Sequence, residues 1–88
     1  MAVLLSTMKV ESYERWRSVF DEGAVARSDH GLTAGKVYQD PTNPNHITVI
    51  VEGDLENMKA YGSSEQLHEA ESRAGLISDT TSFLEDIT

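Results

Sequence analysis

The chain has 88 residues, of which 39% are hydrophobic and 25% are charged, a composition typical of an ordinary globular protein. Fifteen acidic residues against seven basic ones give a formal net charge of -8, which argues against nucleic acid and anionic membranes as partners. The absence of cysteine excludes disulfides, thiolate metal sites and thiol nucleophiles.

At roughly 100–200 residues per domain, we expect residues 1–88 to form a single domain. No apolar run approaches the ~18 residues that a membrane helix needs, and the first ten residues lack the basic segment of a secretion signal. These features predict a cytoplasmic protein. Residues 45–88 hold nine acidic and two basic residues, which predicts an acidic, solvated face in the second half.

The first half of the chain predicts a strand, a helix and a second strand. Residues 3–10 are apolar and rich in β-branched side chains, which favours a strand. Ser12 can cap a helix that runs to about residue 28, and Gly31 can end it in the left-handed conformation. Residues 33–39 are typical of a second strand. The apolar face of the helix recurs at three- and four-residue spacing through Tyr13, Trp16, Phe20 and Ala24.

The second half predicts a strand, an interrupted helix and a last strand. Residues 47–52 form an apolar strand that turn-forming residues 40–45 join to the second strand as an antiparallel hairpin. Asp54 can cap the next helix, which Gly62-Ser63-Ser64 interrupts. Ser63 and Gln66 match a capping box that restarts it, and Gly75 stops it. Residues 80–87 have strand propensity.

The element order β-α-β-β-α-β predicts an α+β, ferredoxin-like fold, with a four-stranded antiparallel sheet and helices on one face. In the third strand, Ile47, Val49 and Val51 face one way and Ile50 faces the other. An apolar sheet face without helices needs a cover, and a chain of this length has nothing left to supply it. We therefore expect a homodimer in which two sheets pack face to face as a dimeric α/β barrel.

Three segments carry a resemblance to a known family: Tyr13-x-x-Trp16-Arg17-x-x-Phe20-Asp21, Val37-Tyr38-x-Asp40-Pro41-x-Asn43-Pro44-Asn45 and Ser63-Ser64-x-x-Leu67. With this topology, residues 3–87 resemble short members of the antibiotic-biosynthesis-monooxygenase-like superfamily. That superfamily includes cofactor-free oxygenases of aromatic polyketides, haem-degrading enzymes, isomerases and small proteins without known activity. The resemblance implies a cofactor-independent oxygenase or cyclase acting on a hydrophobic aromatic molecule, or a non-catalytic binding or dimerisation module.

Four aromatic residues are the candidate substrate-binding residues: Tyr13, Trp16, Phe20 and Tyr38. The first three share the apolar face of the first helix, where they either pack the core or line a pocket for an aromatic ligand. Tyr38 either orients a substrate oxygen or packs against the neighbouring strand of the hairpin.

His30 is the candidate catalytic residue. It ends the first helix, where a cation is favoured by the helix dipole, and its ordinary pKa near 6.5 also suits proton transfer. We expect His46 and His68 on the surface. Arg17 or Arg27 holds an anion or pairs with surface acids.

The sequence indicates no metal site and no nucleotide cofactor. Glu65 and His68 form one Glu-x-x-His pair, but no second ligand cluster accompanies it. No glycine-rich phosphate loop or dinucleotide fingerprint is present, so we expect a protein that works without a cofactor.

Overall fold

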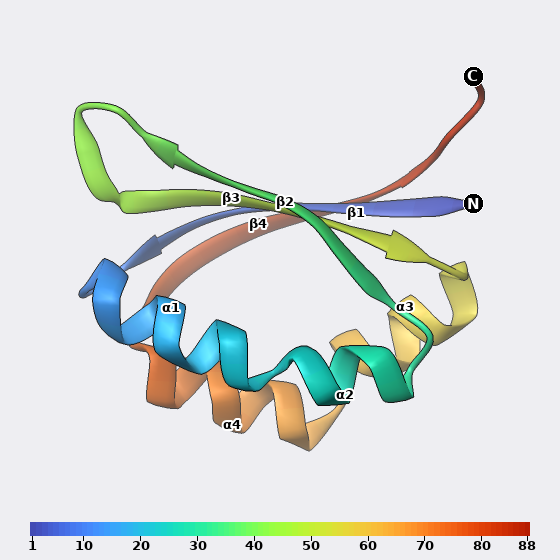
Figure 1. The fold of residues 1–88 in the computed structure, drawn as a ribbon, viewed down its shortest axis with the longest axis horizontal. Helices are drawn as coiled ribbons and strands as arrows, with labels where there is room; N and C mark the ends of the chain where they lie inside the picture. Colours follow the sequence, from blue (N-terminus) through green and yellow to red (C-terminus); the bar gives the residue numbers. More distant parts are fainter.

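The computed structural model describes residues 1–88 as a four-stranded antiparallel sheet with every helix on one of its faces (Figure 1). This arrangement confirms the predicted ferredoxin-like α+β fold. The elements in chain order are β1 (Ala2–Val10), α1 (Tyr13–Glu22), α2 (Ala24–Asp29), β2 (Thr33–Asp40), β3 (Asn43–Gly53), α3 (Leu55–Gly62), α4 (Glu65–Ala74) and β4 (Leu76–Glu85).

The strands lie in the order β2-β3-β1-β4, so that β1 pairs with β3 on one side and β4 on the other. Leu4 lies opposite Val51, and Leu5 lies opposite Ile50. Because side chains alternate between the faces of a strand, Leu4 and Val51 face the helices while Leu5 and Ile50 face away. The predicted opposite orientations of Val51 and Ile50 on this strand are confirmed.

The hydrophobic core fills the space between the sheet and the helices. Met58 on α3 is fully buried, and Ile47 on β3 is 1% exposed. Gly53 ends β3 against the loop before β2, and a Cβ there would lie 2.5 Å from a methyl carbon of Leu32. The buried core residues are Ala2, Val10, Trp16, Leu32, Ile47, Val49, Val51, Met58, Tyr61 and Ala74.

The single helix predicted over residues 13–28 is two helices, α1 and α2, that meet at Gly23. The Gly23 N–H donates to the carbonyl oxygens of Val19 and Phe20, so the backbone tightens at this point. A Cβ on residue 23 would lie 3.0 Å from Nη1 of Arg27. Glycine therefore breaks the helix where the Arg27 guanidinium needs room.

The other differences from the predicted elements concern their ends. Ser64, not Ser63, caps α4, and its Oγ accepts from the Leu67 N–H at 3.2 Å. The hairpin between β2 and β3 is tighter than predicted, because Oδ1 of Asp40 accepts from the Thr42 N–H at 2.8 Å and β3 already begins at Asn43. Strand β4 begins at Leu76, directly after Gly75 ends α4 with a φ of 74°.

Replacing Met58 by alanine tests the core. The side chain is fully buried, so we expect Met58→Ala to lower the free energy of unfolding by about 2–5 kcal/mol. Val25→Ala, at a position 69% exposed on α2, is the control and should change it by less than about 0.5 kcal/mol. Urea denaturation followed by circular dichroism measures both, and equal effects would contradict this assignment of the core.

Candidate functional site

A cavity of about 420 Å³ lies between the sheet and the two rows of helices. Its floor comes from β1, β3 and β4, including Leu4, Ser6 and Val49, and helix residues form its walls. Most of the lining side chains are hydrophobic, with a few polar groups among them. Concave, mainly apolar spaces with few polar groups are typical of sites for small molecules.

An aromatic row on α1 forms part of the wall. The rings of Trp16 and Phe20 are stacked, with centroids 4.9 Å apart and 19° between their planes. Tyr13 continues the row, 6.2 Å from Trp16, but does not border the cavity. Trp16 is only 5% exposed. The two interpretations of this residue therefore hold together, because Trp16 is both a core residue and a cavity wall.

Tyr38 does not lie with the other three aromatic residues. On β2 it pairs with Thr48, on the sheet face that the helices leave open, and it is 51% exposed. The alternation of side chains along a strand sends Tyr38 away from the helices and Val37 toward them. Tyr38 instead borders a second hollow of about 260 Å³, together with His46 and Asp40.

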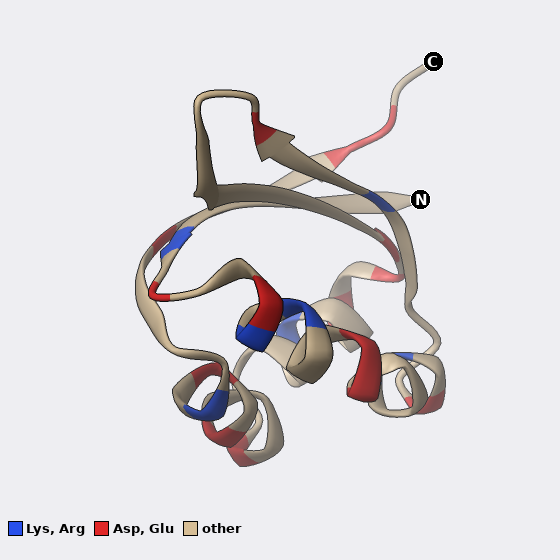
Figure 2. Cartoon of the chain, turned by 60° about the vertical axis from the view of Figure 1, so that its left-hand side comes forward, with Lys and Arg blue, Asp and Glu red and all other residues tan.

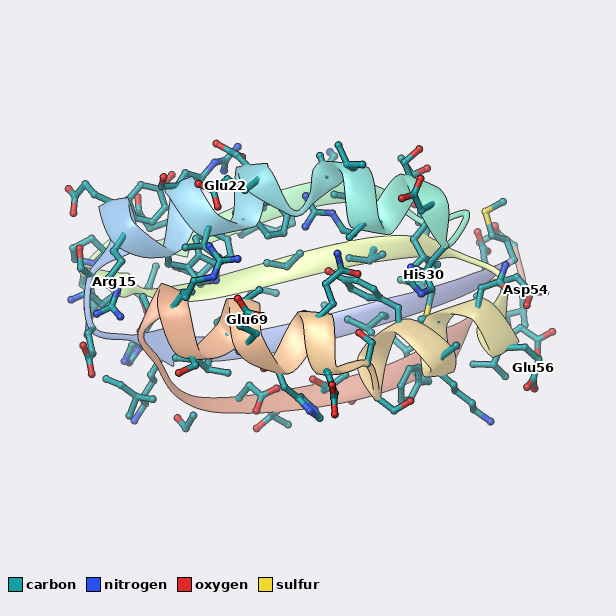
Figure 3. The ribbon with its side chains drawn as sticks, turned by 90° about the horizontal axis from the view of Figure 1, so that it is seen from below. Arg15, Glu22, His30, Asp54, Glu56 and Glu69 are labelled. Carbon is teal, nitrogen blue, oxygen red and sulfur yellow. The ribbon has the colours of Figure 1, made fainter.

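His30 caps the end of α2 and does not border the cavity. Its Nδ1–H donates to the Ala26 carbonyl oxygen at 2.9 Å, since a carbonyl can only accept. Its ring lies 5.3 Å from that of Tyr61, which does border the cavity. In Figure 3, His30 lies toward the end of the molecule that carries Asp54 and Glu56. The geometry matches the capping role considered for this residue.

Three ionisable side chains from α4 and β4 border the cavity: His68, Glu71 and Asp79. Burial raises the pKa of the Glu71 carboxyl above its ordinary value of 4.5, the negative charge of Asp79 raises it further, and His68 lowers it. His68 is exposed as expected, but it borders the cavity, which sequence reasoning missed. Sequence reasoning also missed Glu71. Its spacing was an available signal, because Glu71 follows the inward-facing Leu67 by one helical turn.

Arg27 is the basic residue of the cavity wall and is only 7% exposed. Its Nη2 donates to the Phe20 carbonyl oxygen at 2.9 Å, and its guanidinium carbon lies 4.0 Å from the centroid of the Phe20 ring. None of the ion pairs in the molecule involves Arg27. Arg17, by contrast, pairs with Asp21 at 3.2 Å on the surface.

Contacts between α1 and α4 hold the two helix rows together across the cavity (Figure 3). Arg73 pairs with Glu22 at 3.1 Å, and Nε of Arg15 donates to the Arg73 carbonyl oxygen at 2.6 Å. Exposed ion pairs of this kind contribute about 0–1 kcal/mol to the free energy of unfolding, so their main effect is on the position of the two helices.

None of the helices combines the length and apolar character needed to cross a bilayer. No group of three or more histidine, cysteine, aspartate or glutamate side chains is placed to hold a metal ion. The side chains of the cavity lining that can take part in chemistry are the aromatic wall and the ionisable groups of Arg27, His68, Glu71 and Asp79.

No protein-family model matches the sequence, and a comparison with curated proteins gave no match. Solved structures are much more informative. SnoaB, a cofactor-independent oxygenase from Streptomyces nogalater, superimposes with a TM-score of 0.79 at 11% identity, covering 99% of this chain and 93% of SnoaB. An antibiotic biosynthesis monooxygenase superimposes with a TM-score of 0.76 at 14% identity over the full length of both chains.

The chain has the antibiotic-biosynthesis-monooxygenase fold. An uncharacterized NIPSNAP domain protein from Burkholderia xenovorans shares it as well, with a TM-score of 0.69 at 10% identity over 98% of this chain and 94% of that protein. The structural similarity that the three sequence segments and the element order implied is thus confirmed. At identities this low the similarity concerns the fold, and the activity has to be argued from the cavity.

Glu71→Gln tests the ionisation of the cavity wall. Because the folded protein raises the pKa of Glu71, its protonation stabilises the fold below the ordinary pKa of 4.5, and this stabilisation is lost as the pH rises through the raised value. Glutamine cannot ionise, so we expect Glu71→Gln to unfold at a higher temperature than the wild type at neutral pH. The gain should shrink as the pH falls through the raised pKa of Glu71 and be absent below pH 4.5.

Glu69→Gln is the matched control, since Glu69 lies on the same helix outside the cavity and pairs with Arg73 at 3.6 Å. Thermal unfolding at several pH values measures both variants. A gain for Glu71→Gln that does not depend on pH would contradict the assigned ionisation.

Proposed function

We propose that the protein binds a small hydrophobic aromatic molecule in the cavity and acts on it as a cofactor-independent oxygenase. The observation that carries this proposal is the cavity of about 420 Å³ with the stacked rings of Trp16 and Phe20 on its wall. Aromatic rings favour stacked and edge-to-face contacts with other rings, so this wall suits a flat apolar molecule. SnoaB, which shares the fold, is a cofactor-independent oxygenase and supports the choice of reaction.

Such a reaction takes its electrons from the substrate. Loss of a proton from an activated CH₂ group leaves a carbanion that reduces O₂; one oxygen atom stays on the carbon as a carbonyl, and the other leaves as water with the two hydrogens. The protein has to hold the ring, exclude bulk water and accept a proton. His68 and Glu71 border the cavity and are our candidates for the proton acceptor, whereas His30 does not border it.

The test substrate is anthrone, an aromatic tricycle with an activated CH₂ group that such chemistry converts to anthraquinone. A substitution that fills the cavity should prevent both its binding and its oxidation. Ala70 borders the cavity, so Ala70→Phe should abolish both anthrone binding and O₂ consumption. In the wild type, anthrone at 100 times its Kd should stabilise the fold by about 2.7 kcal/mol. Thermal unfolding, quenching of the single tryptophan and an oxygen electrode measure these effects.

Ala60→Phe is the control, at an exposed position on α3 outside the cavity, and should behave like the wild type. Loss of the proton acceptor should slow O₂ consumption by roughly 10²–10⁴-fold, and His68→Ala, Glu71→Gln and His30→Ala identify which residue it is. Binding without O₂ consumption would overturn the oxygenase and favour the non-catalytic binding module. No binding by the wild type would overturn the proposal as a whole.

We also propose that the protein is a homodimer joined through the open face of the sheet. Figure 1 shows no helix on this face, and Figure 2 places most charged positions on the helices and loops. The face carries apolar side chains at its centre, including Leu5 and Ile50, with Leu84 49% exposed beside them. A second copy of the same face would remove these side chains from water and cover them in a self-complementary way.

Sedimentation equilibrium tests the dimer. We expect a mass twice the 9.7 kDa of one chain at micromolar concentration, and Ile50→Lys should yield monomers because it places a charge at the centre of the face. Val25→Lys, on the exposed side of α2, should remain dimeric. A wild-type monomer would refute this mode of assembly.

A further inference from the structure

Arg27 carries a positive charge that the protein itself leaves without a counterion. The residue is 7% exposed, and the ion pairs of the molecule involve Arg15, Arg17 and Arg73 but not Arg27. Taking a guanidinium out of water is costly unless it is paired and hydrogen-bonded. The chain has fifteen acidic residues, yet none of them forms an ion pair with Arg27.

The hydrogen-bonding capacity of Arg27 is mostly unused. A guanidinium has five N–H donors, and the protein accepts one of them at the Phe20 carbonyl. No buried side-chain nitrogen in the molecule lacks a partner, so the remaining guanidinium nitrogens keep some accessible surface, and the cavity is the space that Arg27 borders. Gly23 leaves space beside the guanidinium, because a Cβ at this position would lie 3.0 Å from Nη1 of Arg27.

The charges around the cavity are divided between its walls. Arg27 lies on α2 beside the Phe20 ring, while Glu71 and Asp79 lie on α4 and β4. An anionic group is repelled by the two carboxylates and attracted by the guanidinium, whose planar fork matches the oxygen atoms of a carboxylate or the single oxygen of a phenolate. A bound ring beside Trp16 and Phe20 would bring such a group within reach of the same wall.

We propose that the ligand of this cavity is an aromatic molecule with one anionic oxygen group, and that the Arg27 guanidinium binds this group. The proposal rests on the proposed function, because it requires that the cavity accept an aromatic molecule. It adds the charge of the ligand and its orientation, with the anionic group toward α2.

The test compares two probes that differ in charge, 2-naphthoate and its methyl ester, by isothermal titration calorimetry at neutral pH. Since hydrogen bonds to charged groups are the stronger kind, the wild type should bind the acid roughly tenfold to a hundredfold more tightly than the ester. Arg27→Met should bind the ester as the wild type does and the acid no more tightly than the ester, because the carboxylates of Glu71 and Asp79 remain. Arg27→Lys should keep part of the preference, because it retains the charge without the planar fork.

Arg17→Met is the matched control. Arg17 also lies near the Phe20 ring, 5.8 Å from its centroid, but it is outside the cavity lining, only half-buried and paired with Asp21, so the preference for the acid should be unchanged. A measurement on the wild type guards against misfolded variants: in NMR spectra the Arg27 Nε–Hε signal should shift with 2-naphthoate and stay in place with the ester.

The outcomes separate the two proposals. Equal binding of acid and ester by the wild type, or a preference that survives in Arg27→Met, would overturn the anion site and leave the aromatic cavity standing. Failure of the wild type to bind either probe would overturn both. A preference that Arg17→Met removes as well would assign it to the general surface charge and also overturn the role of Arg27.

Discussion

The central constraint on this molecule is that one chain covers only one face of its sheet. The apolar side chains of β1 and β3 alternate, with Leu4 and Val51 on one face and Leu5 and Ile50 on the other. All four helices pack on the first face. The core, the cavity and the open face follow from this asymmetry, because each strand has to serve two different environments.

The cavity exists because the helices form two rows instead of one tight layer. Figure 3 shows α1 and α2 in one row and α4 and α3 in the other, with the strands behind them. The break at Gly23 lets the end of the first row carry Arg27 inward, beside Phe20. The second row contributes Glu71, whose raised pKa follows from the same partial burial. One wall is thus cationic and aromatic, and the other is acidic.

The aromatic row illustrates how a residue serves stability and function together. Trp16 is buried and stacked on Phe20, as expected of a residue that packs the core. The same two rings also border the cavity. His30 illustrates the reverse: its chemistry suits proton transfer, but its hydrogen bond to Ala26 and its place at the end of α2 give it a capping role.

Three features could be predicted from the sequence: the chain order of strands and helices, the opposite orientations of Val51 and Ile50, and the inward side of α1. They are predictable because hydrophobic period and turn chemistry are local properties. The position of Tyr38 relative to Trp16 could not be predicted in the same way. Strand alternation shows which residues share a side of the sheet with Tyr38, but not which side the helices cover. The roles of Arg27, His68 and Glu71 depend on how α2 and α4 pack on the sheet. These two helices are distant in the chain, so the cavity that the three residues border forms only when both helices are in place.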